Sequence, residues 1–332
     1  MLFRSVIMKI YLAPLEGVTN YIYRNAYHTF FTPADKYFTP FISTNQHLSY
    51  STKERKEIQP EHNKGLYVVP QILSNKANEF INTVNDIKQY GYTEFNLNLG
   101  CPSNTVVAKN KGSGFLFHKE QLDAFLDTVF SQIDVKLSIK TRLGKFNPEE
   151  FYELMAIFKK YPLEELIIHP RITKDFYKNT PRLELFDATT QELPFPVSYN
   201  GDVFNINDYH SIIKRFPQID SVMLGRGVIA NPGLIGEIKT GTPMTIDLFR
   251  AFHDRLLKDY IEVMSGDKNV LHKMKEFWFY CMPILNVSEK YAKKIKKCEK
   301  IVDYIVLVDA VFSEGSICED RLGYRKLDGL HR

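Results

Sequence analysis

Residues 97–104 read L-N-L-G-C-P-S-N, a polar turn that directly follows apolar sequence. The run Glu94–Leu99 has the length and composition of a buried strand, so the turn lies where that strand ends. Further short runs rich in apolar, β-branched or aromatic residues occur at Lys9–Leu15, Lys36–Ile42, Leu66–Leu73, Lys136–Arg142, Glu165–Arg171, Val197–Asp202 and Ser221–Arg226. The sequence therefore predicts eight strands.

Helical patterns of the length that a crossover connection needs lie between several of these strands. Apolar residues recur at three- and four-residue spacing in Ala77–Tyr90, Lys119–Ile133, Pro148–Tyr161 and Ile206–Phe216. Strand–helix units with a period of about 30 residues fill a TIM barrel of about 240 residues. No G-x-G-x-x-G motif follows the first strand, which disfavours a doubly wound sheet. We therefore expect an α/β fold, a TIM (β/α)8 barrel followed by a smaller all-helical C-terminal domain.

Composition excludes several other classes of protein. The 332 residues are 44% hydrophobic and 25% charged, which is typical of a globular protein, and the net charge of +4 identifies no partner. Four cysteines without a C-x-x-C pair predict neither a zinc site nor a disulfide scaffold. The apolar start is broken by Lys9 and lacks a signal-peptide cleavage site, and Met8 is an alternative start to Met1. We expect a cytoplasmic protein without a metal or a membrane span.

Polar residues gather at the strand ends, where a TIM barrel carries its chemistry. Alternation along the strand places Ser138, Lys140 and Arg142 on one face, with Lys140 pointing into the barrel mouth. An inward ammonium is costly unless it meets an anion or an electron-rich ring, which a bound anionic cofactor would supply. Each residue alone also fits a structural role, but their occurrence on successive strand ends favours a binding site. The ends are 13–17, 70–71, 98–101, 140–142, 169–171, 200–202 and 225–227.

Seven segments together resemble the tRNA-dihydrouridine synthase family in order and spacing, over about residues 9–240. The resemblance departs at Leu15, where the family usually has methionine, and at Pro170, where glycine is common. A Leu-for-Met exchange conserves volume and should leave flavin binding intact. The segments are A-P-L-E-G-V-T, P-Q-I, L-N-L-G-C-P-S, K-T-R-L-G, H-P-R-I-T, Y-N-G-D and L-G-R-G-V.

The resemblance implies an enzyme that reduces the C5–C6 bond of uridine in tRNA with FMN, which NADPH recharges. An inward ammonium at Lys140 would stabilise the negative charge of a reduced flavin. The resemblance also implies substrate contacts for Asn98, Arg142 and Arg171. Both arginines fit the FMN phosphate or a structural ion pair equally well. The implied cofactor residues are Pro14, Leu15, Glu16, Gln71, Lys140, His169, Asn200, Gly201, Asp202, Gly225 and Arg226.

Cys101 is the candidate catalytic acid. Hydride transfer to C6 of uracil leaves an enolate-like carbon at C5, which must be protonated from the face opposite the flavin. A cysteine thiol, with an ordinary pKa of about 8.5, is protonated at neutral pH and still acidic enough to donate. Gly112 and Gly114 in the loop 102–115 are possible hinges that would close Cys101 over an unstacked base.

Beyond residue 241 the pattern is helical only, at Thr245–Met264, Val270–Leu285 and Glu289–Val311. We expect a catalytic domain over 1–241 and an RNA-binding helical domain over 242–332. An apolar stripe is predicted at Tyr291, Ile295, Cys298, Val302 and Ile305. Another face of the same segment carries four lysines, Lys290, Lys293, Lys297 and Lys300. Such a lysine face is ordinarily solvated surface, but the resemblance favours RNA as its partner. Lys273 and Lys275 are possible additions to it.

Three other classes of function remain open from sequence. A small-molecule FMN oxidoreductase of the dihydroorotate dehydrogenase type shares the barrel and the lysine but needs no basic helices. A Schiff-base aldolase could use Lys140 and would bind no flavin. A noncatalytic RNA-binding protein has no need of Cys101 and Lys140 at strand ends. We expect a monomer acting on tRNA; the uridine position, ribosomal RNA as substrate, and NADH in place of NADPH stay open.

Overall fold

The computed structural model of the chain describes residues 8–191 and 193–318, so Met1–Ile7, at the predicted alternative start, lie outside the described residues. The chain divides into two compact units. Unit 1 comprises the described parts of Met1–Pro14, Asp35–Gly201 and Ile213–Met223. Unit 2 comprises Leu15–Ala34, Asp202–Ile212 and the described part of Leu224–Arg332. The predicted functional division at residue 241 stays a prediction.

The sheet follows the order β3-β5-β6-β7-β8-β9-β10-β1-β2-β4. The registered pairings run parallel, as between β6 and β7, where Asn98 lies opposite Lys140. The strands are β1 Lys9–Leu12, β2 Lys36–Phe38, β3 Ile42–Ser43, β4 Val68–Val69, β5 Gln71–Leu73, β6 Glu94–Leu99, β7 Lys136–Arg142, β8 Leu166–His169, β9 Val197–Tyr199 and β10 Ser221–Leu224.

The two ends of this sheet order belong to the same pair of chain segments. Only Pro70 separates β4 from β5, and residues 39–41 separate β2 from β3. Since β4 pairs with β2 and β5 pairs with β3, the segment 36–43 lies beside the segment 68–73. The described residues therefore form a closed ring of eight parallel strand segments, and the predicted TIM barrel is confirmed.

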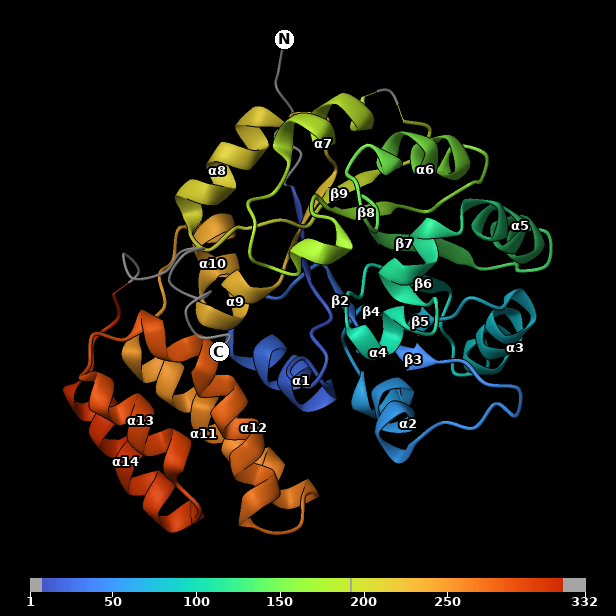
Figure 1. The fold of residues 1–332 in the computed structure, drawn as a ribbon. Coiled ribbons are helices and arrows are strands. Elements are labelled where there is room, and N and C mark those ends of the chain that lie inside the picture. The colour runs from blue at the N-terminus through green and yellow to red at the C-terminus, as the bar shows by residue number, and fades with distance from the viewer. Residues whose placement is uncertain (1–7, 192, 319–332) are drawn as a thin grey trace. The chain divides into compact units, whose positions relative to one another are not determined.

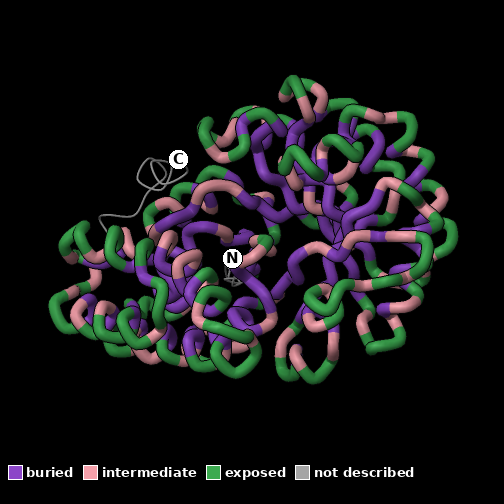
Figure 2. Tube along the Cα trace, turned by 60° about the horizontal axis from the view of Figure 1, so that its bottom comes forward, coloured by how far each residue is buried: buried purple, intermediate pink, exposed green. Residues whose placement is uncertain are grey.

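Helices cover the outside of the strands, as Figure 1 shows for α3, α5 and α6. All residues of β6 are buried, as expected for a parallel strand with a covered outer face and a packed interior. Phe80 of α3 packs edge-on against Phe125 of α5, with ring centroids 5.7 Å apart. Exposed residues concentrate in the outer turns (Figure 2). The helices between residues 52 and 215 are α2 Thr52–Ile58, η1 Pro60–His62, α3 Ala77–Lys88, α4 Asn104–Val107, η2 Gly112–Phe117, α5 Lys119–Phe130, α6 Glu150–Phe158, η3 Thr173–Asp175, α7 Leu183–Thr190 and α8 Ile206–Arg215.

Unit 2 is built from helices around an aromatic core. Phe252 of α11 lies 5.5 Å from Tyr23 and 5.1 Å from Phe31, measured between ring centroids. The predicted helical C-terminal region is confirmed, and α1 packs with it. No helix among residues 8–191 and 193–318 combines the length and apolarity needed to cross a membrane. The helices are α1 Tyr21–Phe30, α9 Arg226–Ala230, α10 Leu234–Thr240, α11 Ile246–Val263, α12 Asp267–Cys281, η4 Met282–Ile284, α13 Glu289–Lys297 and α14 Ile301–Glu314.

The prediction of one helix over Glu289–Val311, with one apolar stripe, is wrong. Cys298 is extended, with φ −65° and ψ 135°, and separates α13 from α14. Lys275 Nζ donates to the Cys298 carbonyl at 2.5 Å and so caps the end of α13. The break changes which side of the chain faces inward: Val302 is 74% exposed and Ile305 41% exposed. The buried face of α14 is formed by Tyr304, Val308, Val311 and Phe312.

A buried chain of hydrogen bonds crosses unit 2 through His253. Trp278 Nε1 donates to Tyr304 Oη at 2.6 Å, and Tyr304 Oη lies 2.6 Å from His253 Nε2. His253 Nδ1 lies 2.8 Å from Asp254 Oδ1, which identifies Nδ1 as the donor and Nε2 as the acceptor. Burial lowers the pKa of His253 below its ordinary value, against the opposing effect of Asp254. The fold therefore favours neutral His253.

We expect the protein to lose stability as the pH falls below about 6.5, the ordinary histidine pKa. In that range the unfolded chain binds a proton that His253 in the fold does not, so the free energy of unfolding rises with pH. Melting temperatures of the wild type and His253→Gln at pH 7.5 and pH 5.5 test this. The variant is expected to show the smaller difference between the two pH values, and an equal difference in both proteins would contradict the assignment.

Candidate active site

Four side chains inside the barrel form a continuous hydrogen-bonded ladder across β5, β6 and β7. Asn96 Nδ2 donates to Ser138 Oγ at 2.9 Å, and Gln71 Nε2 donates to Asn96 Oδ1 at 2.8 Å. Asn98 Nδ2 in turn donates to Gln71 Oε1 at 2.7 Å. All four residues are buried, so their bonds fix the orientation of each amide. The ladder ends at the L-N-L-G-C-P turn.

Asn98 holds the backbone of Cys101. Its Oδ1 accepts from Gly100 N at 3.0 Å and from Cys101 N at 2.9 Å. On the other side, Ser113 donates to the Cys101 carbonyl from its backbone N at 3.1 Å and its Oγ at 2.9 Å. Cys101 is half-buried, so its thiol is positioned by the main chain and still reachable.

Gly112 packs directly against Cys101. A Cβ at Gly112 would lie 2.8 Å from the Cys101 carbonyl oxygen and 3.1 Å from the Cys101 Cβ. Gly112 also has φ of +56°, in the left-handed region that favours glycine. The loop predicted to hinge here is folded into α4 and η2, and Gly112 is a close-packing position. A hinge role for Gly112 and Gly114 stays a prediction.

Lys140 extends from β7 beside Asn98. Burial of the ammonium lowers its pKa to about 7, and the nearby charge of Arg142 acts in the same direction. Over the part of the chain that the structure describes, no side chain or carbonyl hydrogen-bonds to Lys140 Nζ, and no carboxylate pairs with it. An ammonium in this position is stabilised by an anion or an electron-rich ring, which fits the ring of a flavin.

Arg142 is fully buried, and its guanidinium braces three main-chain segments. It donates to the carbonyls of Gly100 at 2.9 Å, Ile172 at 3.0 Å and Phe176 at 2.8 Å. Phe176 offers that carbonyl from φ of +49° and ψ of −98°, a sparsely populated conformation that costs on the order of 1–3 kcal/mol. These bonds account for Arg142 as a brace of the loops around Cys101, and its contact with substrate stays a prediction.

His169 and Arg171 lie side by side at the end of β8. Arg171 Nη1 donates to His169 Nε2 at 2.8 Å, and Arg171 Nε donates to the Asn179 carbonyl at 2.5 Å. Because a guanidinium can only donate, His169 Nε2 is an acceptor and carries no proton. Both side chains are buried, and their predicted roles toward cofactor and substrate stay predictions.

The predicted cofactor residues at 200–202 and 225–226 fall in both units. In unit 1, Asn200 Nδ2 donates to the Met223 carbonyl at 2.8 Å, and a Cβ at Gly201 would lie 2.0 Å from Tyr199 Oη. In unit 2, Arg226 Nη2 pairs with Asp202 Oδ1 at 2.9 Å. The cofactor set as a whole is divided, with Pro14, Gln71, Lys140, His169, Asn200 and Gly201 in unit 1, and Leu15, Glu16, Asp202, Gly225 and Arg226 in unit 2.

The predicted lysine face lies on α13 and the residue before α14, and all four of its lysines are exposed. Lys294 and Lys296 are exposed on the same helix. The suggested addition of Lys273 and Lys275 meets a physical obstacle, because both ammonium groups are engaged within unit 2. Lys273 Nζ donates to the Gly17 carbonyl at 2.7 Å and to Glu276, and Lys275 caps α13.

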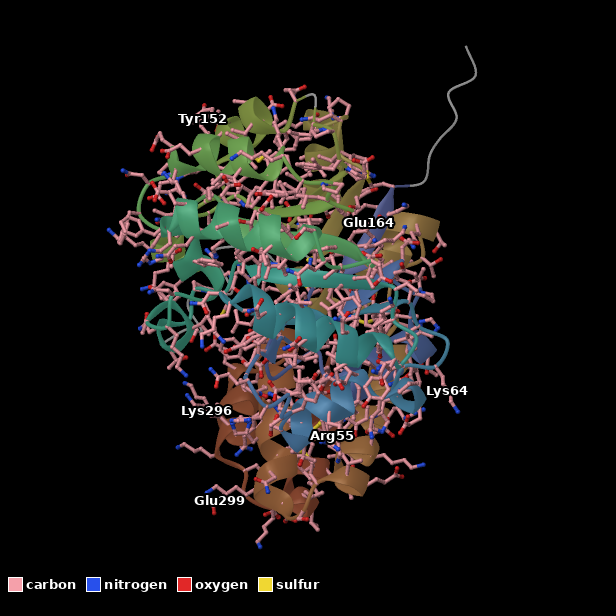
Figure 3. The ribbon with its side chains drawn as sticks, turned by 90° about the vertical axis from the view of Figure 1, so that its right-hand side faces the viewer. Arg55, Lys64, Tyr152, Glu164, Lys296 and Glu299 are labelled. Carbon is pink, nitrogen blue, oxygen red and sulfur yellow. The ribbon has the colours of Figure 1, made fainter. Side chains whose placement is uncertain are left out.

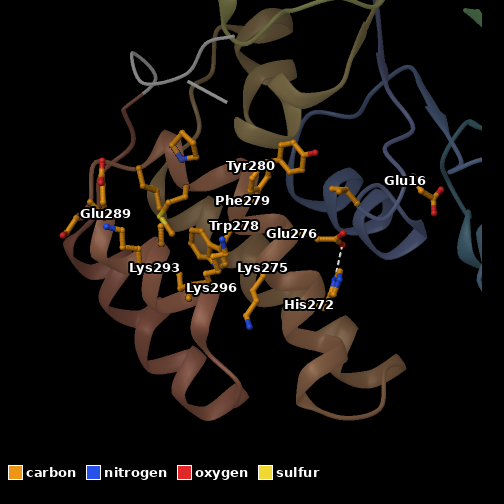
Figure 4. A pocket seen from close by; sticks show the side chains of 18 residues that line it. Glu16, His272, Lys275, Glu276, Trp278, Phe279, Tyr280, Glu289, Lys293 and Lys296 are labelled. Atoms are coloured by element: carbon orange, nitrogen blue, oxygen red, sulfur yellow. Dashed lines mark ion pairs between the residues drawn. The ribbon is translucent and has the colours of Figure 1, made fainter. Parts of the chain in front are cut away.

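A pocket of about 1220 Å³ opens beside these lysines, lined by α12, η4 and α13 (Figure 4). Its wall includes apolar residues of α12 and η4, while Lys293 and Lys296 enter from α13. Glu16 and Glu276 also line it, and His272 Nδ1 lies 3.8 Å from Glu276 Oε2. The pocket thus combines apolar walls with charged groups of both signs.

Asn96, Ser138 and Ser113 are site residues for which no role was predicted from the sequence. Asn96 and Ser138 lie in register across β6 and β7. The alternation that places Lys140 inward also places Ser138 inward, so a polar residue at that position was a usable signal. Ser113 reaches Cys101 through the fold of η2, which no local pattern indicates.

The parallel strand ring and its covering helices define a TIM-barrel protein, with polar side chains gathered at the ends of its strands. The model of the family described as dihydrouridine synthase (Dus) matches residues 11–314, and the chain belongs to this family. It is 25% identical to the probable tRNA-dihydrouridine synthase 1 of Synechocystis sp. over 321 residues, which cover 93% of this chain and 88% of the relative.

A second relative is the tRNA-dihydrouridine(16) synthase of Shewanella oneidensis, 29% identical over 266 residues, covering 75% of this chain and 82% of the relative. Among solved structures, a variant of NCR from Zymomonas mobilis has a TM-score of 0.48 at 14% identity, covering 74% of this chain and 90% of that chain. A likeness this distant says nothing about activity.

Proposed function

We propose that this protein reduces uridines of tRNA to 5,6-dihydrouridine, with FMN as cofactor and NADPH as reductant. The observation that carries the proposal is that Cys101, held by Asn98, and Lys140 lie at the ends of the neighbouring strands β6 and β7, and that Lys140 has no hydrogen-bond partner among the described residues. Membership of the dihydrouridine synthase family and the names of the relatives support the same reaction. We further expect the protein to act as a cytoplasmic monomer.

Bound FMN would supply the hydride that adds to C6 of uracil. Cys101 Sγ donates the proton that C5 requires, and the bonds from Asn98 and Ser113 to its backbone hold the thiol in place. Lys140 offers a positive charge to the electron-rich edge of the flavin ring, and Gln71 offers the amide N–H that Asn96 does not use. Pro14, His169, Asn200 and Gly201 would complete the unit 1 part of the cofactor site.

Direct contacts with the substrate are proposed for side chains whose N–H groups are not all used in the hydrogen bonds described above. Asn98 uses one N–H on Gln71, which leaves the other for a uracil carbonyl. Arg142 donates from Nε, Nη1 and Nη2 to three carbonyls, which leaves two N–H groups for substrate. A substrate contact is also proposed for Arg171, on the family pattern alone. In unit 2, Leu15, Glu16, Asp202, Gly225 and Arg226 are proposed for the flavin on the family pattern alone.

The flavin assignment is tested on the purified protein. It is expected to be yellow, or to bind added FMN, and to release FMN on denaturation, identified by chromatography against FMN and FAD standards. The bound flavin is expected to be bleached by NADPH under anaerobic conditions. A colourless protein that cannot be reconstituted with FMN would rule out the proposed reaction.

We also propose that RNA phosphates contact Lys290, Lys293, Lys297 and Lys300. Each neutralised phosphate releases counterions, so log affinity is expected to fall by roughly 0.7–0.9 per contact as log salt rises. Replacing all four by glutamine should weaken binding of tRNA and flatten that slope by up to about three units, while flavin reduction by NADPH is unchanged. Filter binding across a salt series measures both quantities.

The matched control replaces four exposed lysines elsewhere, Lys64, Lys159, Lys214 and Lys268, by glutamine. This removes the same charge from the protein and should leave the salt slope close to that of the wild type. Equal slopes in both quadruple variants would show that the α13 lysines are ordinary solvated surface and that RNA is held elsewhere.

A further inference from the structure

An exposed cluster of aromatic and basic side chains lies on unit 1 and has no part in the site described above. Phe117 is 52% exposed and Phe146 is 40% exposed, and their rings meet edge to face with centroids 5.2 Å apart. Lys145 Nζ lies 5.2 Å from the Phe117 centroid and 5.0 Å from the Phe146 centroid. Lys174 Nζ lies 4.8 Å from the Phe146 centroid. These four residues are called the aromatic–lysine patch.

The aromatic–lysine patch is assembled from three successive loops at the end of the barrel that carries the candidate site. Phe117 ends η2, which follows β6 and the Cys101 turn. Lys145 and Phe146 follow β7, the strand of Lys140, while Lys174 lies in η3 after β8, the strand of His169. A partner seated on the patch would therefore lie next to the barrel mouth.

Hydrogen bonds tie the three loops into one surface. Thr173 N donates to the Gly144 carbonyl at 3.0 Å, and Thr173 Oγ1 reaches the Gly144 and Ser113 carbonyls at 3.2 and 3.5 Å. The Glu150 carboxylate accepts from the backbone N–H groups of Lys145, Phe146 and Asn147 at 2.8–2.9 Å. The rings are thus presented by a braced backbone, which lowers the entropy lost on binding.

The charges of the patch are not neutralised by the protein. Within residues 8–191 and 193–318, no carboxylate pairs with Lys145 or Lys174. Two acidic groups of the same loops have other partners, since Glu150 caps backbone N–H groups and Asp175 binds Arg182. Two ammonium groups resting on exposed rings are held by only about 0.5–1 kcal/mol each, so they move readily to a stronger anion.

We propose that the aromatic–lysine patch is an RNA-binding surface, on which unpaired bases stack against Phe117 and Phe146 while Lys145 and Lys174 move to the flanking phosphates. This rests on the proposed action on tRNA and adds a second contact area, on the barrel itself. Flat rings interleaved with unpaired ammonium groups match the alternation of base and phosphate along a single strand. An acidic peptide would form ion pairs with the lysines, but binding it does not require two adjacent aromatic rings.

Three double variants test the proposal by binding of an unmodified tRNA transcript across a salt series. Phe117→Ala with Phe146→Ala should weaken binding by about tenfold or more and leave the salt slope unchanged, because stacking releases no counterions. Lys145→Gln with Lys174→Gln should flatten the slope by up to about 1.5 units. The control is Tyr152→Ala with Lys159→Gln on α6 and just after it, which removes an exposed ring (Figure 3) and an exposed lysine that are not part of the patch.

Circular dichroism melts confirm that each variant is folded, and flavin reduction by NADPH should equal that of the wild type in all three. If the wild type binds and modifies tRNA while both patch variants bind like the control, the patch is not an RNA surface, and a protein partner becomes its alternative. If the wild type itself neither binds nor modifies tRNA, the proposed function fails, and this inference fails with it.

Discussion

Cys101→Ala is expected to abolish dihydrouridine formation, by at least about 100-fold in rate, while the flavin still binds and is still reduced by NADPH. The thiol is assigned only to protonation of C5, and Asn98 holds it through the backbone, which alanine keeps. Single-turnover reduction of tRNA uridine by the prereduced protein isolates this step. Flavin bleaching by NADPH in the absence of RNA measures the other half-reaction.

Cys318→Ala is the matched control, because Cys318 is also half-buried and belongs to unit 2 rather than the barrel. It should keep both half-reactions. Equal loss of flavin reduction and uridine reduction in Cys101→Ala would show that Cys101 shapes the flavin site instead of donating a proton.

Lys140→Gln is expected to slow reduction of the bound flavin by NADPH about 100-fold, because it removes the positive charge that offsets the electrons entering the ring. The pKa of Lys140 is lowered to about 7, so its ammonium is lost as the pH rises through that value. FMN binding by the wild-type apoprotein should therefore weaken above about pH 7, where the ammonium that would face the anionic cofactor is lost, and the variant should lack this alkaline limb.

Lys136→Gln provides the comparison on the same strand. Lys136 is exposed at the start of β7 and pairs with Glu164 at 3.0 Å, which is a surface ion pair of little energetic weight. Its replacement should leave the rate and the pH profile unchanged. A Lys140→Gln profile that keeps the limb near pH 7 would assign that titration to another group.

The barrel was predictable because its strands are short apolar runs with polar ends, a local pattern. Period-two alternation also placed Lys140 inward, and the register of β6 and β7 sets it opposite Asn98. The helix break at Cys298 was not predictable, since the apolar spacing continues through it. What ends α13 is a tertiary contact, the bond from Lys275 Nζ to the Cys298 carbonyl.

The hydrogen-bond partners of Arg142 and of the lysines on α12 also could not be predicted from the sequence. Arg142 bonds to carbonyls of Gly100, Ile172 and Phe176, which are up to 42 residues away along the chain. The bond from Lys273 Nζ to the Gly17 carbonyl spans 256 residues. Periodicity reports which face a residue occupies and carries no information about such partners.

Dihydrouridine formed in an unmodified tRNA transcript by the purified protein, FMN and NADPH tests the central proposal most directly. Nucleoside mass spectrometry is expected to show a product two mass units above uridine, at stoichiometry approaching one or a few per tRNA, and none with Cys101→Ala. Absence of dihydrouridine from a flavin-loaded protein that NADPH reduces would contradict the proposed reaction and point to a small-molecule substrate.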